Sequence, residues 1–182
     1  MLEKFYLYKV VSGKDVDSFG KIYDLYIDKI YRFIFFKVKS AEEAQDLTSE
    51  VFLKAWQYLS GPAGKTISNI NAFLYKLARN SVIDFYRRQK NNVELNEAIE
   101  VEDKNMAVPE AVDIKNEWQN LMSSLNQLKD EYREVLLLRY TEELSVEEIS
   151  KVIDKTNGAT RVILHRAMIA LKTVCAQNHG KN

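Results

Sequence analysis

The chain has 182 residues, of which 46% are hydrophobic and 29% charged, and its 26 Lys and Arg balance 26 Asp and Glu. This composition is typical of a soluble globular protein and excludes a chain that is disordered throughout. One cysteine, Cys175, and two histidines exclude a disulfide framework and a zinc site of Cys and His ligands, so we expect a cytoplasmic protein.

The first residues, MLEKFYLYKV, lack the sustained apolar run and the small-residue cleavage site of a signal peptide. The most apolar segment, IYRFIFFKV, contains Arg32 and is far shorter than the roughly 20 residues that a membrane span requires. We therefore expect no insertion into a membrane.

Helical periodicity dominates residues 1–88. Apolar side chains recur at steps of three and four residues over about 16–39, 41–59 and 70–88. The stretch SGPAGKTISN, with two glycines and a proline, separates the last two helices. Because no segment alternates with period two for long enough to form a strand, the pattern predicts an all-α domain.

A change of charge separates this domain from the rest of the chain. Residues 1–88 hold 14 basic and 10 acidic side chains, a balance of +4, whereas residues 89–112 hold 2 and 6, a balance of −4. The acidic segment also lacks helical periodicity and aromatic residues. We interpret residues 89–109 as a flexible acidic linker that joins two small helical domains.

The second domain, residues 110–182, contains four helical stretches. They span about residues 109–125, 130–140, 145–153 and 157–176. Ser145 and Glu148 fit a capping box at the start of the third stretch. A short turn leads from there into the last helix, and these proportions predict a helix-turn-helix at the end of the domain.

The last helix lies within TNGATRVILHRAMIALK and has a candidate DNA-reading face. Arg161 and His165 lie one turn apart on that face, and Arg166 lies beside them, placed for a phosphate. An α-helix fits the DNA major groove, where an Arg can bond guanine through two acceptors. For this helix alone, a solvated face of an ordinary bundle helix is an open alternative.

The helix INAFLYKLARNSVIDFYRRQK combines cations, aromatic rings and an amide. We expect these side chains to be exposed: Tyr75, Lys76, Arg79, Asn80, Tyr86, Arg87 and Arg88. Cations follow phosphates, rings stack on bases and an amide bonds a base edge, so the set suits single-stranded nucleic acid. The loop 61–69 is placed to form one wall of a pocket for a flipped base. The alternative is that Tyr75 and Phe85 belong to the core and the Arg pair is a solvated helix end.

The helix over residues 41–59 has four acidic residues opposite its apolar stripe. They are Glu42, Glu43, Asp46 and Glu50. Such a face repels DNA and suits a basic protein partner. The alternative is that these acids gather there because they stabilise the N-terminal end of the helix dipole.

No catalytic pattern accompanies these surfaces. The sequence has no Gly-rich phosphate loop, no HExxH, no metal-ligand spacing and no Ser/His/Asp pattern. It therefore predicts a protein that is not an enzyme and that needs no cofactor or metal.

Three segments, in this order, resemble the bacterial RNA polymerase sigma factors of the extracytoplasmic-function (ECF) group. AEEAQDLTSEVFLKAW is similar to the polymerase-docking helix of that family, and INAFLYKLARNSVIDFYRRQK to its −10 recognition and melting helix. LNQLKDEYREVLLLRYTEELSVEEISKVIDKTNGATRVILHRAMIALK is similar to its −35-reading domain. The resemblance covers about residues 16–88 and 110–174, and it implies a transcription initiation factor that binds core RNA polymerase and helps to open promoters.

The resemblance also assigns roles by motif position. It implies that Asp46 and Glu50 face the coiled coil of the polymerase β′ subunit, and that the β flap is a second contact. At the −10 element it implies contacts by Tyr75, Lys76, Arg79, Asn80, Arg87 and Arg88. At the −35 element it implies contacts by Arg161, Val162, His165 and Arg166. In this family Asn80 would hold a flipped base, and an anti-sigma factor is a further expected partner.

Two positions depart from the family pattern. Phe73 stands where many members carry Trp, and Val162 with Ile163 replaces a common Ser-Arg pair. The change removes a hydrogen bond and a cation from the −35-reading helix, but Val162 suits contact with a thymine methyl.

Two other function classes stay open from the sequence. A free-standing transcription regulator would combine the helix-turn-helix with a helical sensing or dimerisation domain, but such a domain has no need for Arg79, Asn80 and the RRQK end on a surface helix. A helical adaptor without a nucleic-acid role requires both basic faces to be incidental. For a sigma factor a neutral chain is expected, because polymerase supplies most phosphate contacts.

Overall fold

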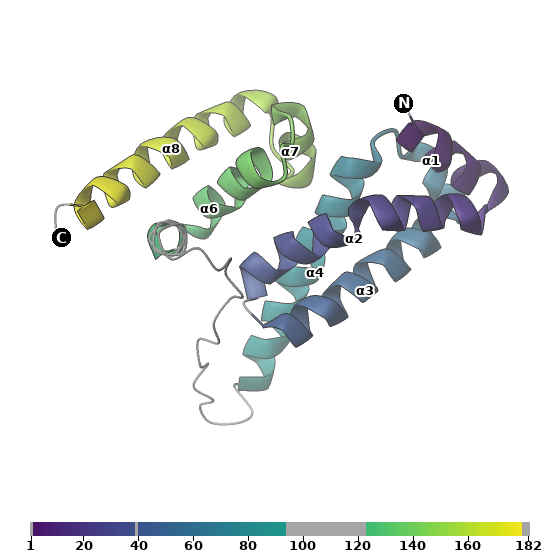
Figure 1. The fold of residues 1–182 in the computed structure, drawn as a ribbon, viewed down its shortest axis with the longest axis horizontal. Helices are drawn as coiled ribbons and strands as arrows, with labels where there is room; N and C mark the ends of the chain where they lie inside the picture. Colours follow the sequence, from purple (N-terminus) through teal and green to yellow (C-terminus); the bar gives the residue numbers. More distant parts are fainter. Residues whose placement is uncertain (1, 39, 94–122, 180–182) are drawn as a thin grey trace, which may run out of the picture. The chain divides into compact units, whose positions relative to one another are not determined.

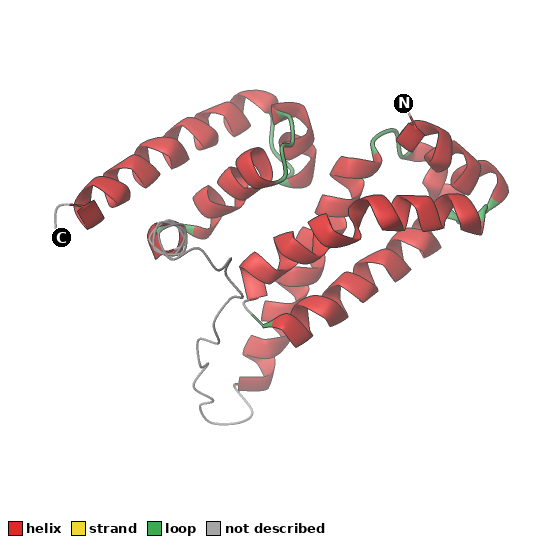
Figure 2. Ribbon diagram, viewed as in Figure 1, coloured by secondary structure: helices red, strands yellow, loops and turns green. Residues whose placement is uncertain are grey.

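The computed structural model describes residues 2–38, 40–93 and 123–179, in which helices are joined by short loops (Figures 1 and 2). No strand occurs among these described residues, which confirms the predicted all-α class. The chain divides into two compact units, Met1–Lys104 and Asn105–Asn182. None of the helices in the described ranges is long and apolar enough to cross a membrane.

Within its described residues, the first unit contains four α-helices and one 3₁₀ turn. They are α1 (Leu2–Gly13), α2 (Val16–Val38), α3 (Ala41–Leu59), η1 (Pro62–Thr66) and α4 (Ile70–Val93). Helices α2, α3 and α4 pack against one another, and α1 packs mainly on α2 (Figure 1). The predicted periodicity accounts for this core, since residues at steps of three and four lie on one side of each helix. Fully buried examples are Ile22, Ile30, Val51 and Leu74.

Helix α1 is an element that the sequence pattern does not predict. Its buried side chains are Leu7 and Val10, whereas Leu2, Phe5 and Tyr8 are 52–70% exposed. Because apolar side chains occur on both sides of the helix, it has no clear amphipathic stripe. The packing of Leu7 and Val10 against the rest of the unit stabilises the helix, and this contact is tertiary.

The loop between α3 and α4 makes a tight turn at Gly64. The Gly64 N–H donates to the carbonyl of Gly61 (3.2 Å), and the Gly64 carbonyl accepts from the Ile67 N–H (3.0 Å). A Cβ at position 64 would lie 2.3 Å from the carbonyl oxygen of Leu59, so only glycine fits without a backbone shift. The loop therefore passes directly against the end of α3, where the Gly61 N–H donates to the Tyr58 carbonyl (3.2 Å).

Helix α4 is longer than the sequence predicts. The side-chain oxygen of Asn69 accepts from the Ala72 N–H (2.9 Å) and caps its start. The helix continues past Arg88 to Val93, where Gln89 and Lys90 are good helix formers and the two asparagines that follow are not. The first residues of the predicted linker are therefore helical, and its part from residue 94 onward lies outside the described residues.

The second unit is described from residue 123. Its elements are a helical turn at 123–126, α6 (Asp130–Leu136), the π-helical turn η2 (Leu137–Thr141), α7 (Val146–Val152) and α8 (Asn157–His179). Most of the helix predicted over residues 109–125 lies outside the described residues. The helix predicted over 130–140 divides into α6 and η2. Four consecutive apolar residues, 135–138, are buried there and form the centre of this unit's core.

Candidate nucleic-acid interface

Local capping builds the helix-turn-helix of the second unit. Ser145 Oγ accepts from the Glu148 N–H (3.2 Å), and Glu148 Oε2 accepts from the Ser145 N–H (2.9 Å). The predicted capping box is thus present, and it starts α7.

A short turn then leads into α8. Asp154 adopts the left-handed conformation, with a φ of 54°, and the Lys155 N–H donates to the carbonyl of Ser150 (3.0 Å). Thr156 Oγ1 accepts from the Ala159 N–H (3.2 Å) and caps α8. These bonds fix the first turn of α8, the part of a recognition helix that approaches bases.

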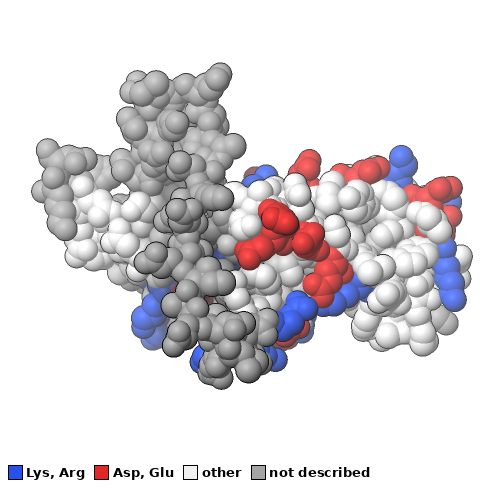
Figure 3. Space-filling view, turned by 90° about the horizontal axis from the view of Figure 1, so that it is seen from below, with Lys and Arg blue, Asp and Glu red and all other residues white. Residues whose placement is uncertain are grey.

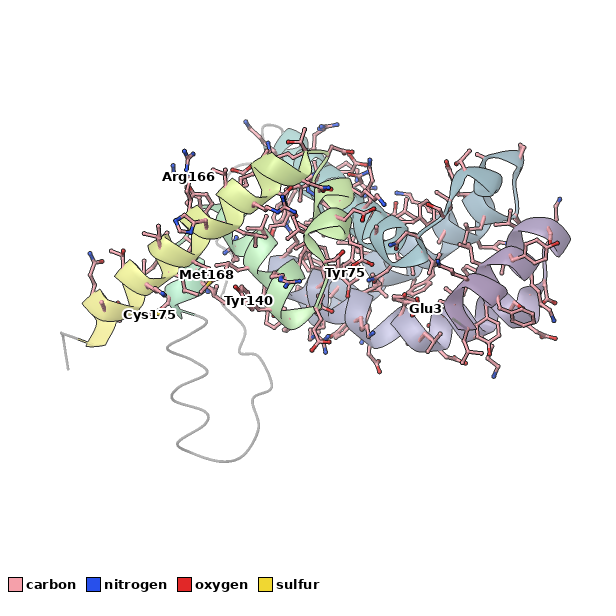
Figure 4. The ribbon with its side chains drawn as sticks, turned by 90° about the horizontal axis from the view of Figure 1, so that it is seen from above. Glu3, Tyr75, Tyr140, Arg166, Met168 and Cys175 are labelled. Carbon is pink, nitrogen blue, oxygen red and sulfur yellow. The ribbon has the colours of Figure 1, made fainter. Side chains whose placement is uncertain are left out.

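Helix α8 has one buried and one exposed side. Thr160 and Ala167 are fully buried against the rest of the unit. The opposite side is exposed and carries the four predicted −35 contacts, which we call the α8 recognition face: Arg161, Val162, His165 and Arg166. Arg166 projects away from the helix (Figure 4). The structure thus brings these four residues to one surface.

The exposed side of α8 extends beyond the predicted residues. Ile169 is 53% exposed and follows Arg166 by three positions, and Lys172 is exposed one turn later. An open hollow of about 540 Å³ beside the helix-turn-helix turn is lined partly by Lys151 and Lys155. The sequence analysis did not include these two lysines among the candidate DNA contacts, although both lie beside the turn of the predicted helix-turn-helix. Each of them has a carboxylate partner, Glu147 for Lys151 (2.7 Å) and Glu131 for Lys155 (3.5 Å), so a DNA phosphate here would compete with these ion pairs.

Helix α4 presents most of its predicted nucleic-acid contacts at the surface. Asn80, Arg87 and Arg88 are exposed, and Lys76 and Arg79 are partly exposed. We call these five residues the α4 basic face. Lys76, Asn80 and Arg87 lie opposite the buried side of the helix and Arg79 lies at its margin, whereas Arg88 lies on the flank toward α3, where it pairs with Glu50.

Tyr75 is a correction to the prediction for α4. Its side chain is fully buried, and its ring meets that of Phe33 edge to face, with centroids 5.4 Å apart. A ring in this position cannot stack on a base without leaving the core. The alternative noted for the sequence, that Tyr75 is a core residue, is the correct one.

Tyr86 is the exposed aromatic residue nearest in sequence to the two arginines of α4. Its ring is 45% exposed, and its hydroxyl donates to the carbonyl of Lys37 (2.6 Å). The hydrogen bond holds the ring in place beside Arg87. Phe73 lies at the other end of the helix, half-buried, with its ring 5.1 Å from that of Tyr58.

The acidic residues predicted for the third surface lie on α3. Asp46 and Glu42 are exposed, while Glu43 and Glu50 are partly exposed, and we call these four residues the α3 acidic face. Figure 3 shows the molecule from below the view of Figure 1, and acidic side chains form a band on that surface. Partial burial and the neighbouring Glu42 raise the pKa of Glu43. Glu50 differs from the other three because it pairs with Lys54 and with Arg88 of α4.

The arrangement suits binding of charged macromolecules. Two basic surfaces, on α4 and α8, fit nucleic acid, and one acidic surface fits a basic protein. Among the described residues, no group of three or more His, Cys, Asp or Glu is placed to hold a metal ion.

Comparison with known proteins places both units in one family. Residues 22–92 match the family model for sigma-70 region 2, and residues 118–171 match the model for sigma-70 region 4. The first match spans α2 to α4, and the second includes the helix-turn-helix.

Whole-chain relatives agree with these matches. The chain is 30% identical to the ECF RNA polymerase sigma factor SigW of Bacillus subtilis, over 90% of this chain and 92% of SigW. It is also 30% identical to the ECF RNA polymerase sigma factor BldN of Streptomyces coelicolor, over 86% of this chain but only 60% of BldN. The sigma factor RpoE of Bartonella quintana, solved in complex with the anti-sigma factor NepR, has a similar fold, with a TM-score of 0.70, 22% identity and coverage of 86% and 95% of the two chains. The chain belongs to the ECF group of RNA polymerase sigma factors, the transcription initiation factors that direct RNA polymerase to promoters.

Proposed function

We propose that the three surfaces divide the work of this sigma factor: the α3 acidic face docks on core RNA polymerase, the α4 basic face binds the −10 strand, and the α8 recognition face reads the −35 element. One observation carries the proposal. The charged and amide residues that the family motifs single out on α3, α4 and α8 are all at least partly exposed, while each of these helices buries apolar residues on its other side, such as Leu47, Ala78 and Ala167. In this assignment residues 1–88 form the region 2 domain, 89–109 the acidic linker and 110–182 the region 4 domain.

Docking is assigned to α3 because its exposed carboxylates are complementary to a basic partner and repel DNA. Asp46 and Glu50 lie one turn apart, and both side chains reach the surface. We assign the coiled coil of the polymerase β′ subunit to this face, and the β flap to the second unit, from the family resemblance.

Strand binding is assigned to α4 because cations and an amide share one side of the helix. Asn80 is exposed and is assigned a base edge, whereas Arg79, Arg87 and Arg88 are assigned backbone phosphates. Tyr86, rather than the buried Tyr75, supplies the exposed ring for stacking. This exchange preserves the chemistry of the predicted site.

At the −35 element, Arg161 and His165 are assigned hydrogen bonds to base edges, and Arg166 a phosphate. Val162 is 48% exposed beside them and is assigned a thymine methyl. The free-standing regulator loses its support, because residues 22–92 match sigma-70 region 2 rather than a separate sensing domain.

Regulation and location follow from the same proposal. The similar fold of RpoE is solved with the anti-sigma factor NepR, and we assign an anti-sigma factor to this chain as well. The chain then acts in the cytoplasm, where polymerase and promoters are, and as a binding subunit rather than an enzyme.

Asp46→Lys tests the assignment of the docking face. Reversing this charge is expected to weaken binding to core RNA polymerase at least tenfold, while the fold is kept, because surface charge changes cost little stability. Native-gel titration against sigma-free core polymerase measures the affinity, and run-off transcription from a randomised promoter library measures initiation. Asp24→Lys makes the same change on an exposed position of α2 and serves as the control. Equal affinity of the Asp46→Lys chain and the control would remove α3 from the docking site.

A further inference from the structure

A cluster of five charged side chains joins the α3 acidic face to the α4 basic face. Glu50 Oε1 lies 2.6 Å from Lys54 Nζ on the same helix, and Glu50 Oε2 lies 3.8 Å from Arg88 Nη2 on α4. Asp84 adds a second carboxylate, with its Oδ1 3.7 Å from Arg87 Nη1. The five side chains line a hollow of about 270 Å³. Glu50, which is assigned to polymerase docking, therefore forms an ion pair with Arg88, which is assigned to DNA strand binding.

Lys54 holds this cluster at the seam between the two helices. Its ammonium group donates to Glu50 on α3 and, over 3.4 Å, to the hydroxyl of Ser81 on α4. Lys54 thus positions the Glu50 carboxylate between α3 and α4. Lys54 itself belongs to neither the α3 acidic face nor the α4 basic face. The side chain of Glu50 is 34% exposed and that of Arg88 is 62% exposed, so each is accessible to an external partner.

We infer that Glu50 couples polymerase docking to DNA strand binding. In the free chain its carboxylate pairs closely with Lys54 and, at 3.8 Å, also with Arg88, and a basic polymerase group that pairs with Glu50 weakens its hold on Arg88 and leaves Arg88 more available to a strand phosphate. A guanidinium beside a carboxylate attracts a phosphate less strongly than one without that neighbour, because the two negative groups repel each other. The inference rests on the proposed docking role of α3 and strand-binding role of α4.

Reciprocity makes the coupling measurable from both sides. If docking strengthens strand binding by some factor, strand binding must strengthen docking by the same factor. The Glu50–Arg88 pair is partly exposed and screened, which limits the factor to about 1.5- to 5-fold. Such a device leaves the free chain a weaker DNA binder than the chain on polymerase.

Glu50→Gln tests the inference, because it removes the charge and keeps the size of the side chain. Fluorescence anisotropy with the full chain and a labelled, mixed-sequence single-stranded 20-mer measures strand affinity at low salt. We expect Glu50→Gln to raise that affinity by about 1.5- to 5-fold beyond the control Asp24→Asn, which removes one exposed charge from α2. The gain is expected to disappear in the Arg88→Gln background. A saturating 20-mer is likewise expected to tighten binding of the wild-type chain to core polymerase more than that of Arg88→Gln.

Two results would overturn the inference, and they are distinguishable. If Arg88→Gln lowers strand affinity but Glu50→Gln gives no more than Asp24→Asn, the strand-binding role of α4 stands and the coupling does not. If Arg88→Gln leaves strand affinity unchanged, the proposed role of Arg88 fails and the coupling falls with it.

Discussion

At the scale of single residues, Tyr75 and Tyr86 show how one helix gives two tyrosines opposite roles. They lie eleven positions apart on α4, yet Tyr75 is fully buried against Phe33 and Tyr86 is 45% exposed. Eleven residues are about three helical turns, so both rings lie on nearly the same side of α4, and the difference depends on position along the helix. Phe33 packs on Tyr75, whereas Tyr86 lies near the end of α2 and bonds the Lys37 carbonyl. Exposure, not residue type, therefore decides which ring is available to a base.

Arg161→Ala is expected to weaken recognition at one or two −35 positions. If Arg161 bonds a guanine through two acceptors, its loss costs roughly 1–3 kcal/mol at those positions. Binding of the holoenzyme to a panel of −35 variants measures the effect, and Lys172→Ala is the control, since Lys172 is an exposed cation further along α8. A uniform loss across all promoter sequences would instead make Arg161 a phosphate contact.

At the scale of elements, short segments of this chain depend on single residues. The loop between α3 and α4 needs glycine at position 64, and α2 begins at a side-chain cap from Asp15. Both features are local. At position 64 there is no room for a Cβ, and at position 15 a side-chain hydrogen bond caps the helix. Each predicts a distinct effect on stability.

Gly64→Ala is expected to destabilise the first unit by about 1–3 kcal/mol. The new Cβ would lie 2.3 Å from the Leu59 carbonyl oxygen, a backbone atom that cannot move aside alone. Urea unfolding measures the change. Gly20→Ala is the matched control, because nothing lies within 4 Å of its added Cβ, and inside α2 it is expected to stabilise by up to about 1 kcal/mol. Equal midpoints for the two variants would contradict the prediction.

Asp15→Ala is expected to lower the thermal midpoint in a pH-dependent way. Asp15 Oδ2 accepts from the Ser18 N–H (3.2 Å), and its hydrogen bonds with Ser18 lower the pKa of the carboxyl below 3.8. A carboxyl with a lowered folded-state pKa stabilises the protein above its unfolded pKa, and the effect is lost as the pH falls through the folded value. The difference in thermal midpoint between the variant and wild type should be largest near pH 7. It should shrink as the pH falls below 3.8. Asp15→Asn, which keeps an acceptor without the charge, should show a smaller difference from wild type with the same pH dependence, because either substitution removes the titrating carboxyl.

At the scale of the whole molecule, charge is segregated rather than absent. The 26 basic and 26 acidic residues cancel, yet α3 presents an acidic face while α4 and α8 present basic ones. Local faces can therefore bind DNA and protein although the chain has no net field to attract DNA from a distance.

Unaided DNA binding is expected to be weak and steeply salt-dependent. Contacts between basic side chains and phosphates supply most of the unaided binding and each releases counterions, so log K falls linearly with log salt, with a slope set by the number of phosphates neutralised. Anisotropy titrations with promoter duplex at several salt concentrations measure the slope. Tight, sequence-specific binding at physiological salt without polymerase would contradict this prediction.

Local chemistry determined much of this protein directly from the sequence. Several features follow from residues within about four positions of one another. They are the capping box at Ser145, the helices α2, α3 and α8, and the exposed positions of Arg161 and His165 on α8. Interactions of this range depend little on the rest of the chain. The all-α class and the helix-turn-helix could be predicted for that reason.

Only the tertiary structure decided the features that join distant segments. Helix α1 needs the packing of Leu7 and Val10, the burial of Tyr75 needs Phe33 of α2, and the pairing of Glu50 with Arg88 needs α3 and α4 side by side. None of these partners is close in sequence, so no periodicity or spacing encodes them. The packing of whole helices creates such contacts, and they determine which predicted site residues are available for binding.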